Sequence, residues 1–224
     1  MAFFSRFFSR AESAPLPSLE TLLQKHGLPR DLQGLDDLVP DFEHQDAQGR
    51  EDWVDALAEL REVGLPLPAA WPEAQYDLMP ELVPGWMAER DGFFFKPFID
   101  ALSQRVLVAG RPMPDAWLTL WGVSEEDVME RALDQLRDKS KGHPFQRLAS
   151  GVYRSTYADG LDASRLLLPE LWQDLFPGQN KFVAVPAQGC LLVSPQVLLP
   201  QLIEALDPEL ADEAHRLLGT IFQV

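Results

Sequence analysis

The first part of the chain has the hydrophobic pattern of short amphipathic helices. Ser18 can cap one helix, whose leucines fall on one face and which Gly27 can end. A stronger helical pattern runs from about residue 50 to residue 63, and Gly64 follows it as a stop signal. We therefore expect a mainly helical N-terminal part.

A proline-rich stretch follows this helical part. Prolines recur across residues 66–84, and proline removes a backbone donor and clashes with the preceding helical turn, so no long helix is expected there. We interpret the stretch as a linker or an irregular wrap, with a domain boundary near residues 65–90. The predicted domains are residues 1–75, helical and acidic, and residues 76–224, of α+β type.

The second part mixes strand and helix patterns. Residues 104–109 form a short β-branched run typical of a strand, and a helix capped by Ser124 extends to about residue 139, with acidic residues first and basic residues last. Residues 151–157 alternate as in a half-exposed or edge strand. Residues 181–194 read as two apolar strands joined by a tight turn, so this hairpin should lie centrally in its sheet.

The strands and helices do not alternate as regular βαβ units, and this order favours an α+β fold. We predict an antiparallel sheet of about four to five strands packed by helices, preceded by the mainly helical N-terminal part. The proline after Ser194 and the proline after Asp207 predict the start of two more helices.

Four segments between about Phe94 and Leu206 resemble, in order and spacing, the YtpQ-like family of uncharacterised bacterial proteins. They are KPFIDALSQRVLVAG, WLTLWGVSEEDVMERALDQLR, VYRSTYADGLDASRLLLPELW and FVAVPAQGCLLVS. The resemblance covers somewhat more than half of the chain. It implies an α+β domain of bacterial origin, and it implies no reaction.

The charge balance of the chain is strongly acidic. The 35 acidic residues outnumber the 19 basic ones and give a net charge of −16, which repels a phosphate backbone, so no nucleic-acid partner is expected. Residues 31–62 hold eleven acidic residues and two arginines, a local net charge of −9. This region is either a solvated face or an acidic docking surface for a basic protein. A small basic cluster contains Arg137, Lys139, Lys141 and Arg147.

The repeat in MAFFSRFFSR places aromatic and basic side chains on opposite sides of a helix. Its residues are Phe3, Phe4, Phe7 and Phe8 on one side and Arg6 and Arg10 on the other. The pattern suits packing on the chain's own core or on a second copy, binding to a partner protein, or contact with a membrane surface. No apolar run approaches the roughly 18 residues of a membrane-spanning helix, so no integral membrane association is expected. The single cysteine agrees with a cytoplasmic location.

Sequence signatures for catalysis, metals and cofactors are weak. Cys190 next to Gly189 could be a nucleophile at a hairpin turn, but a small buried hydrophobic residue is the favoured interpretation. Residues 41–46, DFEHQD, match no metal-binding spacing and are interpreted as a solvated acidic loop. Glycine-rich phosphate loops are absent from the sequence, so no cofactor and no metal are predicted. No nucleophile-and-base signature surrounds the four histidines, His26, His44, His143 and His215.

The stretch DGLDASRLLLPELW contains the candidate binding residues. Asp159 and Gly160 can form a tight turn, Asp162 can cap a helix that starts at Ala163, and Ser164 lies in the first turn of that helix. Arg165 lies near the unfavourable end of the helix dipole, so it should pair with Asp159, with Asp162 or with a ligand carboxylate.

Two functions remain open from the sequence. The first is a cytoplasmic, non-catalytic interaction or regulatory protein, whose partner binds at the acidic 31–62 surface or at the N-terminal phenylalanine repeat. The second is a hydrolase or transferase whose site lies near residues 151–165 and uses Asp159, Asp162, Ser164 and Arg165. A deep pocket lined by these polar groups would favour the enzyme, whereas a shallow apolar or acidic surface would favour the interaction protein.

Overall fold

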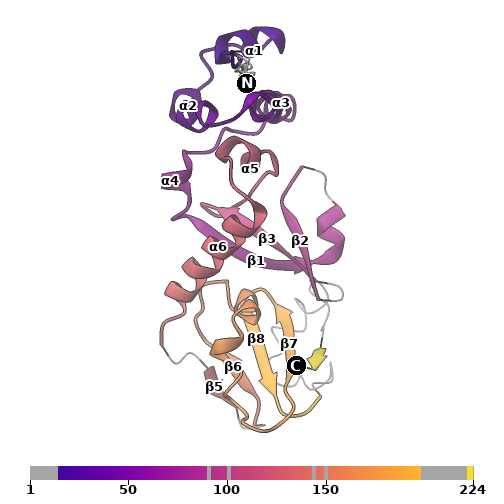
Figure 1. The fold of residues 1–224 in the computed structure, drawn as a ribbon. Coiled ribbons are helices and arrows are strands. Elements are labelled where there is room, and N and C mark those ends of the chain that lie inside the picture. Colours follow the sequence, from indigo (N-terminus) through magenta and orange to yellow (C-terminus); the bar gives the residue numbers. More distant parts are fainter. Residues whose placement is uncertain are drawn as a thin grey trace, which may run out of the picture.

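The structure is a computed structural model that describes residues 15–89, 92–99, 102–142, 145–148, 151–197 and 221–223. Three layers follow one another along an elongated molecule, as Figure 1 shows: a helical end, a four-stranded sheet and a five-stranded sheet. Both sheets are antiparallel. The predicted α+β class with a helical N-terminal part is therefore confirmed, and the strands expected in one sheet are divided between two.

Three helices form the helical end. Ser18 and Asp46 cap two of them, because their side-chain oxygens accept hydrogen bonds from the amides of Thr21 and Gly49. Gly64, at φ +71°, follows the last helix in a left-handed conformation that glycine adopts without strain. The helices are α1 (Leu19–Lys25), α2 (Leu35–Glu43) and α3 (Ala47–Glu62). The predicted helices after Ser18 and before Gly64 are confirmed.

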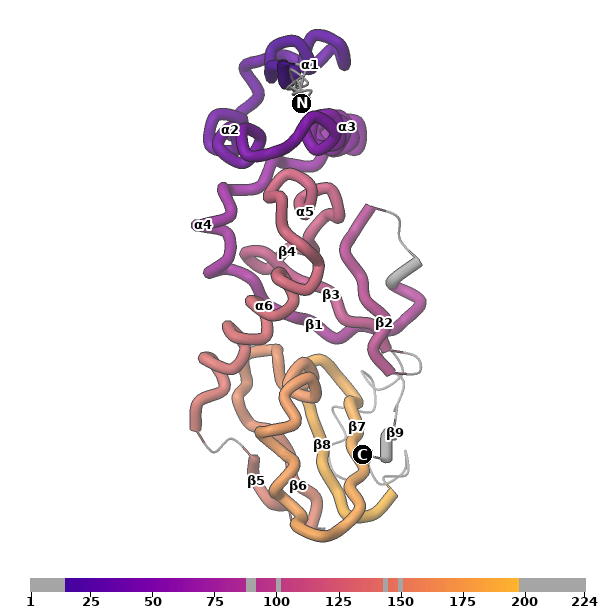
Figure 2. Tube along the Cα trace, in the orientation of Figure 1, coloured from indigo at the N-terminus to yellow at the C-terminus, as the bar shows by residue number. Residues whose placement is uncertain are grey.

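A short helix, α5 (Ala116–Trp121), joins the helical end to the rest of the chain (Figure 2). The buried Trp53 of α3 donates a hydrogen bond from its indole nitrogen to the carbonyl oxygen of Leu120, at 2.9 Å. Trp117 and Trp121 donate to the carbonyl oxygens of Pro66 and Ala69, at 3.3 and 2.8 Å. One hydrophobic cluster therefore contains residues from both sides of residue 75, and the division into domains 1–75 and 76–224 stays a prediction.

The first sheet has the strand order β1-β3-β2, and β4 also pairs with β3. Its strands are β1 (Leu78–Pro84), β2 (Phe95–Ile99), β3 (Leu102–Val108) and β4 (Arg111–Pro112). The strand predicted at residues 104–109 is confirmed as β3. Strand β1 lies in the stretch predicted to be an irregular wrap, and that prediction is wrong for these residues. The two prolines of β1 are tolerated because β1 is an edge strand, where one row of backbone donors needs no strand partner.

The helix α6 (Glu125–Lys139) follows the first sheet and packs against β1. Ser124 and Asp127 form a reciprocal capping box at its start, and basic residues occupy its last turn. The predicted helix is confirmed. Shorter elements flank the first sheet: α4 (Trp71–Ala74) and the 3₁₀ helix η1 (Gly85–Glu89).

The second sheet has the order β5-β6-β8-β7-β9. Its strands are β5 (Phe145–Arg147), β6 (Tyr153–Ser155), β7 (Phe182–Ala187), β8 (Cys190–Ser194) and β9 (Ile221–Gln223). The predicted hairpin is β7–β8, and its central position is confirmed. Residues 151–157 were predicted to form a half-exposed or edge strand. Strand β6 is half-buried, but β5 pairs with its outer side, so it is not an edge strand.

Two short 3₁₀ helices, η2 (Ala163–Leu167) and η3 (Pro169–Leu171), pack beside the second sheet. Leu82 of β1 belongs to the hydrophobic cluster of this second sheet, so the two sheets share part of one core. Residues 195–197 are not helical. The remaining residues of the two helices predicted after Ser194 and after Asp207 lie outside the described residues, as does the phenylalanine repeat at residues 3–10. Within the described part of the chain, no helix has the length and apolarity needed to cross a membrane.

Replacing Trp53 by Phe should lower the free energy of unfolding by about 2 kcal/mol or more, because the carbonyl of Leu120 loses its donor and a buried cavity opens. Chemical denaturation followed by circular dichroism measures this loss. The matched control is Trp86→Phe, at a side chain that is 58% exposed, which should change stability by less than about 0.5 kcal/mol. Equal losses for the two variants would show that the Trp53 hydrogen bond does not hold α3 to α5.

Candidate functional site

The predicted site lies where β6 leaves the second sheet and turns into η2. Gly160 adopts φ +76°, and the Asp159 carboxylate accepts a hydrogen bond from the amide of Leu161, at 3.0 Å. This side-chain contact two residues along the chain closes the tight turn that the sequence predicted. The turn brings Asp159 back over the start of η2, where Arg165 lies.

Arg165 pairs with Asp159 inside the protein. Its side chain is fully buried, and Nη1 and Nη2 donate to Oδ1 and Oδ2 of Asp159, at 2.8 and 2.7 Å. Two parallel hydrogen bonds between a guanidinium and a carboxylate combine charge attraction with a fixed geometry. Of the three partners considered for Arg165, the structure therefore assigns Asp159.

The Arg165 guanidinium also binds the end of α6 and an aromatic ring. Its Nε donates to the hydroxyl oxygen of Ser140, at 2.9 Å, and its central carbon lies 3.4 Å from the centre of the Tyr157 ring. Tyr157 donates its hydroxyl to the carbonyl oxygen of Ser140, at 2.8 Å, and Ser140 donates to the carbonyl oxygen of Leu136, at 2.6 Å. These contacts tie the turn, η2 and the last turn of α6 together.

Asp162 does not cap a helix, and the predicted capping role is wrong. Its backbone has helical angles, φ −58° and ψ −42°, whereas a capping residue needs an extended backbone to aim its side chain at the first amides. Its Oδ1 instead accepts from the amide of Tyr157, at 3.2 Å. Its Oδ2 is buried and has no hydrogen-bond partner among the described residues. Asp162 thus holds the chain on the strand side of the turn.

Ser164 joins the two sheets. Its side chain is buried, and its hydroxyl oxygen accepts a hydrogen bond from the amide of Leu82 in β1, at 3.2 Å. This bond gives an amide on the free edge of β1 an acceptor. The hydroxyl is therefore engaged in holding η2 against the first sheet.

The electrostatics of this group favour a stable ion pair. The hydrogen bonds from Arg165 hold the pKa of Asp159 below its usual range, although burial acts in the opposite direction. Burial raises the pKa of the Tyr157 hydroxyl. The result is a carboxylate and a guanidinium that neutralise each other, with a neutral phenol between them and α6.

The sequence predicted four members of this group, Asp159, Asp162, Ser164 and Arg165, and the structure brings all of them together. Reasoning from the sequence did not find Tyr157 and Ser140, which complete the contacts of Arg165. Ser140 ends a helix that is separated from η2 by two strands. No spacing rule connects these residues, and the only local signal was a polar residue directly after the predicted end of α6.

An apolar groove lies on the helical end, away from this group. It has a volume of about 490 Å³ and lies between the start of α2, the end of α3 and the segment 65–69. Its walls are formed by partly buried or buried leucines, and Asp37 and Arg61 stand at its rim. The leucines are Leu32, Leu57, Leu65 and Leu67. We name this feature the linker groove.

A smaller acidic groove of about 310 Å³ lies between α3 and α5. Four acidic residues line this groove: Asp52, Asp55 and Glu59 of α3, and Asp115, the residue before α5. Burial raises the pKa of Asp115, and the carboxylates of Glu125 and Glu59 raise it further. Among the described residues, no group of three or more histidine, cysteine or acidic side chains has the arrangement of a metal site.

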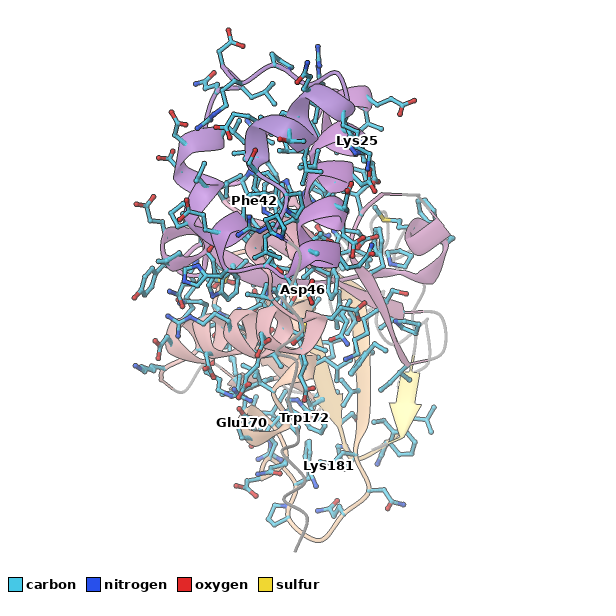
Figure 3. All side chains as sticks on the ribbon, turned by 45° about the horizontal axis from the view of Figure 1, so that its top comes forward. Lys25, Phe42, Asp46, Glu170, Trp172 and Lys181 are labelled. Atoms are coloured by element: carbon cyan, nitrogen blue, oxygen red, sulfur yellow. The ribbon has the colours of Figure 1, made fainter. Side chains whose placement is uncertain are left out.

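Two other candidates from the sequence have structural roles. Cys190 is fully buried in β8, in agreement with the favoured interpretation as a small hydrophobic residue. The stretch 41–46 was predicted to be a solvated loop, and this is wrong for residues 41–43, which end α2 with Phe42 buried. Asp46 caps α3, and a ring nitrogen of His44 lies 2.6 Å from the carbonyl oxygen of Pro40. Figure 3 shows Asp46 at the helical end of the molecule.

The basic cluster predicted at residues 137–147 forms ion pairs near the start of the second sheet. Arg137 pairs with Asp134 and with Glu170, and Lys141 pairs with Asp138. Figure 3 shows Glu170 and Trp172 in the strand-rich part below α6. Two of the four members of the cluster, Arg137 and Lys141, therefore have carboxylate partners.

Comparison with known proteins finds no family model, no curated protein and no solved structure that matches the chain. The resemblance of residues 94–206 to the YtpQ-like family stays a prediction.

Replacing Arg165 by Ala should lower the free energy of unfolding by about 3 kcal/mol or more, because Asp159 and Ser140 lose a buried partner. Arg165→Lys should recover only part of this loss, since an ammonium lacks the two-pronged geometry. Urea denaturation gives both values. The control is Arg137→Ala, in exposed ion pairs, with an expected loss below about 1 kcal/mol. If Arg165→Ala behaves like this control, the pair is not structural.

The Asp159 pair should also make stability depend on pH. The folded-state pKa lies below the unfolded value of about 3.9, so the pair contributes fully above about pH 4 and its contribution is lost as pH falls through the folded pKa. The difference in unfolding free energy between wild type and Asp159→Asn should therefore be constant near neutral pH and shrink below about pH 4. Asp174→Asn, at an exposed carboxylate, is the control. A difference that widens on acidification would contradict the assigned sign.

Proposed function

We propose that this protein is a non-catalytic interaction module whose linker groove binds a segment of another protein. The segment would combine apolar side chains, which enter the groove, with arginine or lysine, which faces the acidic helical end. Binding of an apolar face in a groove between helices is a common mode of peptide recognition. A cytoplasmic location and bacterial origin, which the single cysteine and the YtpQ-like resemblance favour, belong to the same proposal.

The observation that carries this proposal is the linker groove itself. Its volume of about 490 Å³ lies within the range of about 300 to 1,000 Å³ that is usual for binding pockets. Its leucine walls are only partly covered by the rest of the protein, apart from the buried Leu57. A bound apolar segment would cover the part of these leucines that is still exposed to water.

The charge around the groove favours a basic partner. Residues 31–62 carry a net charge of −9, and the two arginines in this region point to backbone carbonyls. Arg50 donates to the carbonyl oxygens of Gln45, Pro17 and Glu43, and Arg61 to that of Gly27. Lys25 pairs with Glu51 and Arg30 with Asp36, both from outside the region. The region stays acidic after these pairs, and its remaining field would raise the rate of association with a basic segment.

The hydrolase or transferase alternative has less support. A nucleophile or general base needs an accessible reacting atom and a pKa matched to its task. Arg165 and Ser164 are buried and bonded within the protein, and the pKa of Asp159 is lowered rather than raised. None of the four candidate residues lines the linker groove or the acidic groove.

Selection from a displayed library of random peptides tests the proposal without a known partner. The selection uses two full-length chains, the wild type and a variant in which Phe3, Phe4, Phe7 and Phe8 are replaced by Ser, so that the N-terminal repeat cannot compete. Enriched peptides should combine Phe or Leu with Arg or Lys. Their affinity should fall about tenfold or more in Asp37→Lys, which places a cation at the groove rim.

The matched control is Glu43→Lys, which makes the same change of charge in α2 at an exposed residue outside the groove lining. Its effect on peptide affinity should be below about threefold, because it changes only the distant field. Equal losses in the two variants would mean that only net charge matters. No enrichment on either full-length chain, or enrichment of acidic peptides, would contradict the proposed function.

A further inference from the structure

A histidine ring lies between two carboxylates where α1 meets α3. His26 directly follows α1, and its side chain is 20% exposed. Its Nδ1 lies 3.2 Å from Oδ1 of Asp55, and its Nε2 lies 3.7 Å from Oε2 of Glu51. The two acidic residues are one helical turn apart on α3, so each ring nitrogen has its own carboxylate. Nε2 is buried and has no hydrogen-bond partner in the described part of the chain.

The protonation state of the ring decides how well it fits this position. A neutral imidazole has one N–H and one lone pair, whereas an ionised carboxylate only accepts hydrogen bonds. The neutral ring can therefore donate toward one carboxylate, and its lone pair then faces the other. A protonated ring has a donor on each nitrogen and a charge that both carboxylates attract. We propose that His26 is a pH-sensitive clamp, which takes up a proton and then holds the end of α1 on α3.

The charged groups around the ring favour its protonated form. His26 lies at the C-terminal end of α1, where the helix dipole favours a cation. Lys25, labelled in Figure 3, pairs with Glu51 at 2.6 Å, and Asp55 has no other ion-pair partner among the residues that the structure describes. The hydrogen bond from Lys25 holds the pKa of Glu51 below its usual value, although burial acts in the opposite direction. Glu51 therefore stays ionised over the range in which imidazoles titrate, about pH 5 to 8.

The clamp anchors the connection between α1 and α2. Directly after His26, the carbonyl oxygen of Gly27 accepts a hydrogen bond from Nη1 of Arg61, at 3.3 Å. The connection then leads to residues 32–34, which line the linker groove together with Arg61. Protonation of His26 therefore steadies one wall of the groove. This consequence rests on the proposed function, whereas the clamp itself does not.

Urea denaturation of the full-length chain at about pH 5.5 and about pH 8 tests the clamp. The variant is His26→Gln, which keeps an amide donor but takes up no proton. The contribution of the clamp to stability is present at the lower pH and is lost as pH rises, because the folded protein binds the proton more tightly than the unfolded chain. The substitution should therefore raise the equilibrium constant of unfolding by a factor that is about threefold or more larger at the lower pH. An equal factor at both pH values, or a larger one at the higher pH, overturns the inference.

Two controls assign the pH dependence to these ion pairs. In a background that carries Glu51→Gln and Asp55→Asn, the factor for His26→Gln should be the same at both pH values, because the proton has no carboxylate left to face. His44→Gln removes an exposed histidine that follows α2, away from the contact of α1 with α3, and its factor should change by less than about twofold. A pH dependence that survives in the double background, or that His44→Gln matches, overturns the inference.

Amide hydrogen exchange locates the effect at the end of α1. The amides of His26 and Leu28 donate to the carbonyl oxygens of Leu22 and Leu23, at 3.0 and 2.8 Å. After correction for the intrinsic exchange rate, their protection in the wild type should be about threefold or more higher at the lower pH, and in His26→Gln it should not change. Equal protection at both pH values in the wild type overturns the clamp. None of these measurements uses a ligand, so they decide on the clamp whether or not the linker groove binds a partner.

Discussion

The lower half of the molecule depends on one buried cation. Burying the Arg165 guanidinium is unfavourable unless every charge is compensated, and this requirement dictates the surrounding structure. A carboxylate must reach it, so the chain turns at Asp159 and Gly160. The face of the guanidinium must be covered, so the Tyr157 ring lies against it. The helix α6 must end where the Ser140 hydroxyl can accept a hydrogen bond from Nε of Arg165. The contacts of one side chain therefore fix the position of α6, β6 and η2 relative to one another.

The upper half depends on indole donors rather than on charge. Trp53, Trp117 and Trp121 each bury an aromatic surface and donate one hydrogen bond to a backbone carbonyl. Two of these carbonyls belong to the proline-rich segment, whose backbone lacks donors of its own at each proline. The indoles thus hold a segment that cannot form a regular ladder or helix, and this segment forms one wall of the linker groove.

Local signals in the sequence predicted the helices after Ser18 and Ser124, the strand β3 and the central β7–β8 hairpin, because capping residues and apolar periodicity act within a few residues. Strand β1 was not predicted from the sequence, because its prolines are tolerated only in an edge strand. That edge position is set by pairing with residues 102–108, which lie far along the chain. The tight turn at Asp159 was predictable for the same local reason as the helices. Tyr157 and Ser140 were not, since their contact with Arg165 exists only once α6 packs beside the second sheet.

The distribution of charge separates the two halves. Residues 145–197 contain four acidic and four basic side chains, so this part is electrically neutral, whereas residues 31–62 carry a net charge of −9. Repulsion among carboxylates destabilises a compact state, and at Asp115 the carboxylates of Glu125 and Glu59 add to burial, the larger cause, in raising the pKa. If the acidic excess served only solubility, it could be spread over the whole surface at a lower cost in repulsion. Of these carboxylates only Asp37 lines the linker groove, together with Arg61, whereas Asp52, Asp55 and Glu59 line the acidic groove between α3 and α5, so the excess field belongs to the helical end as a whole rather than to one groove.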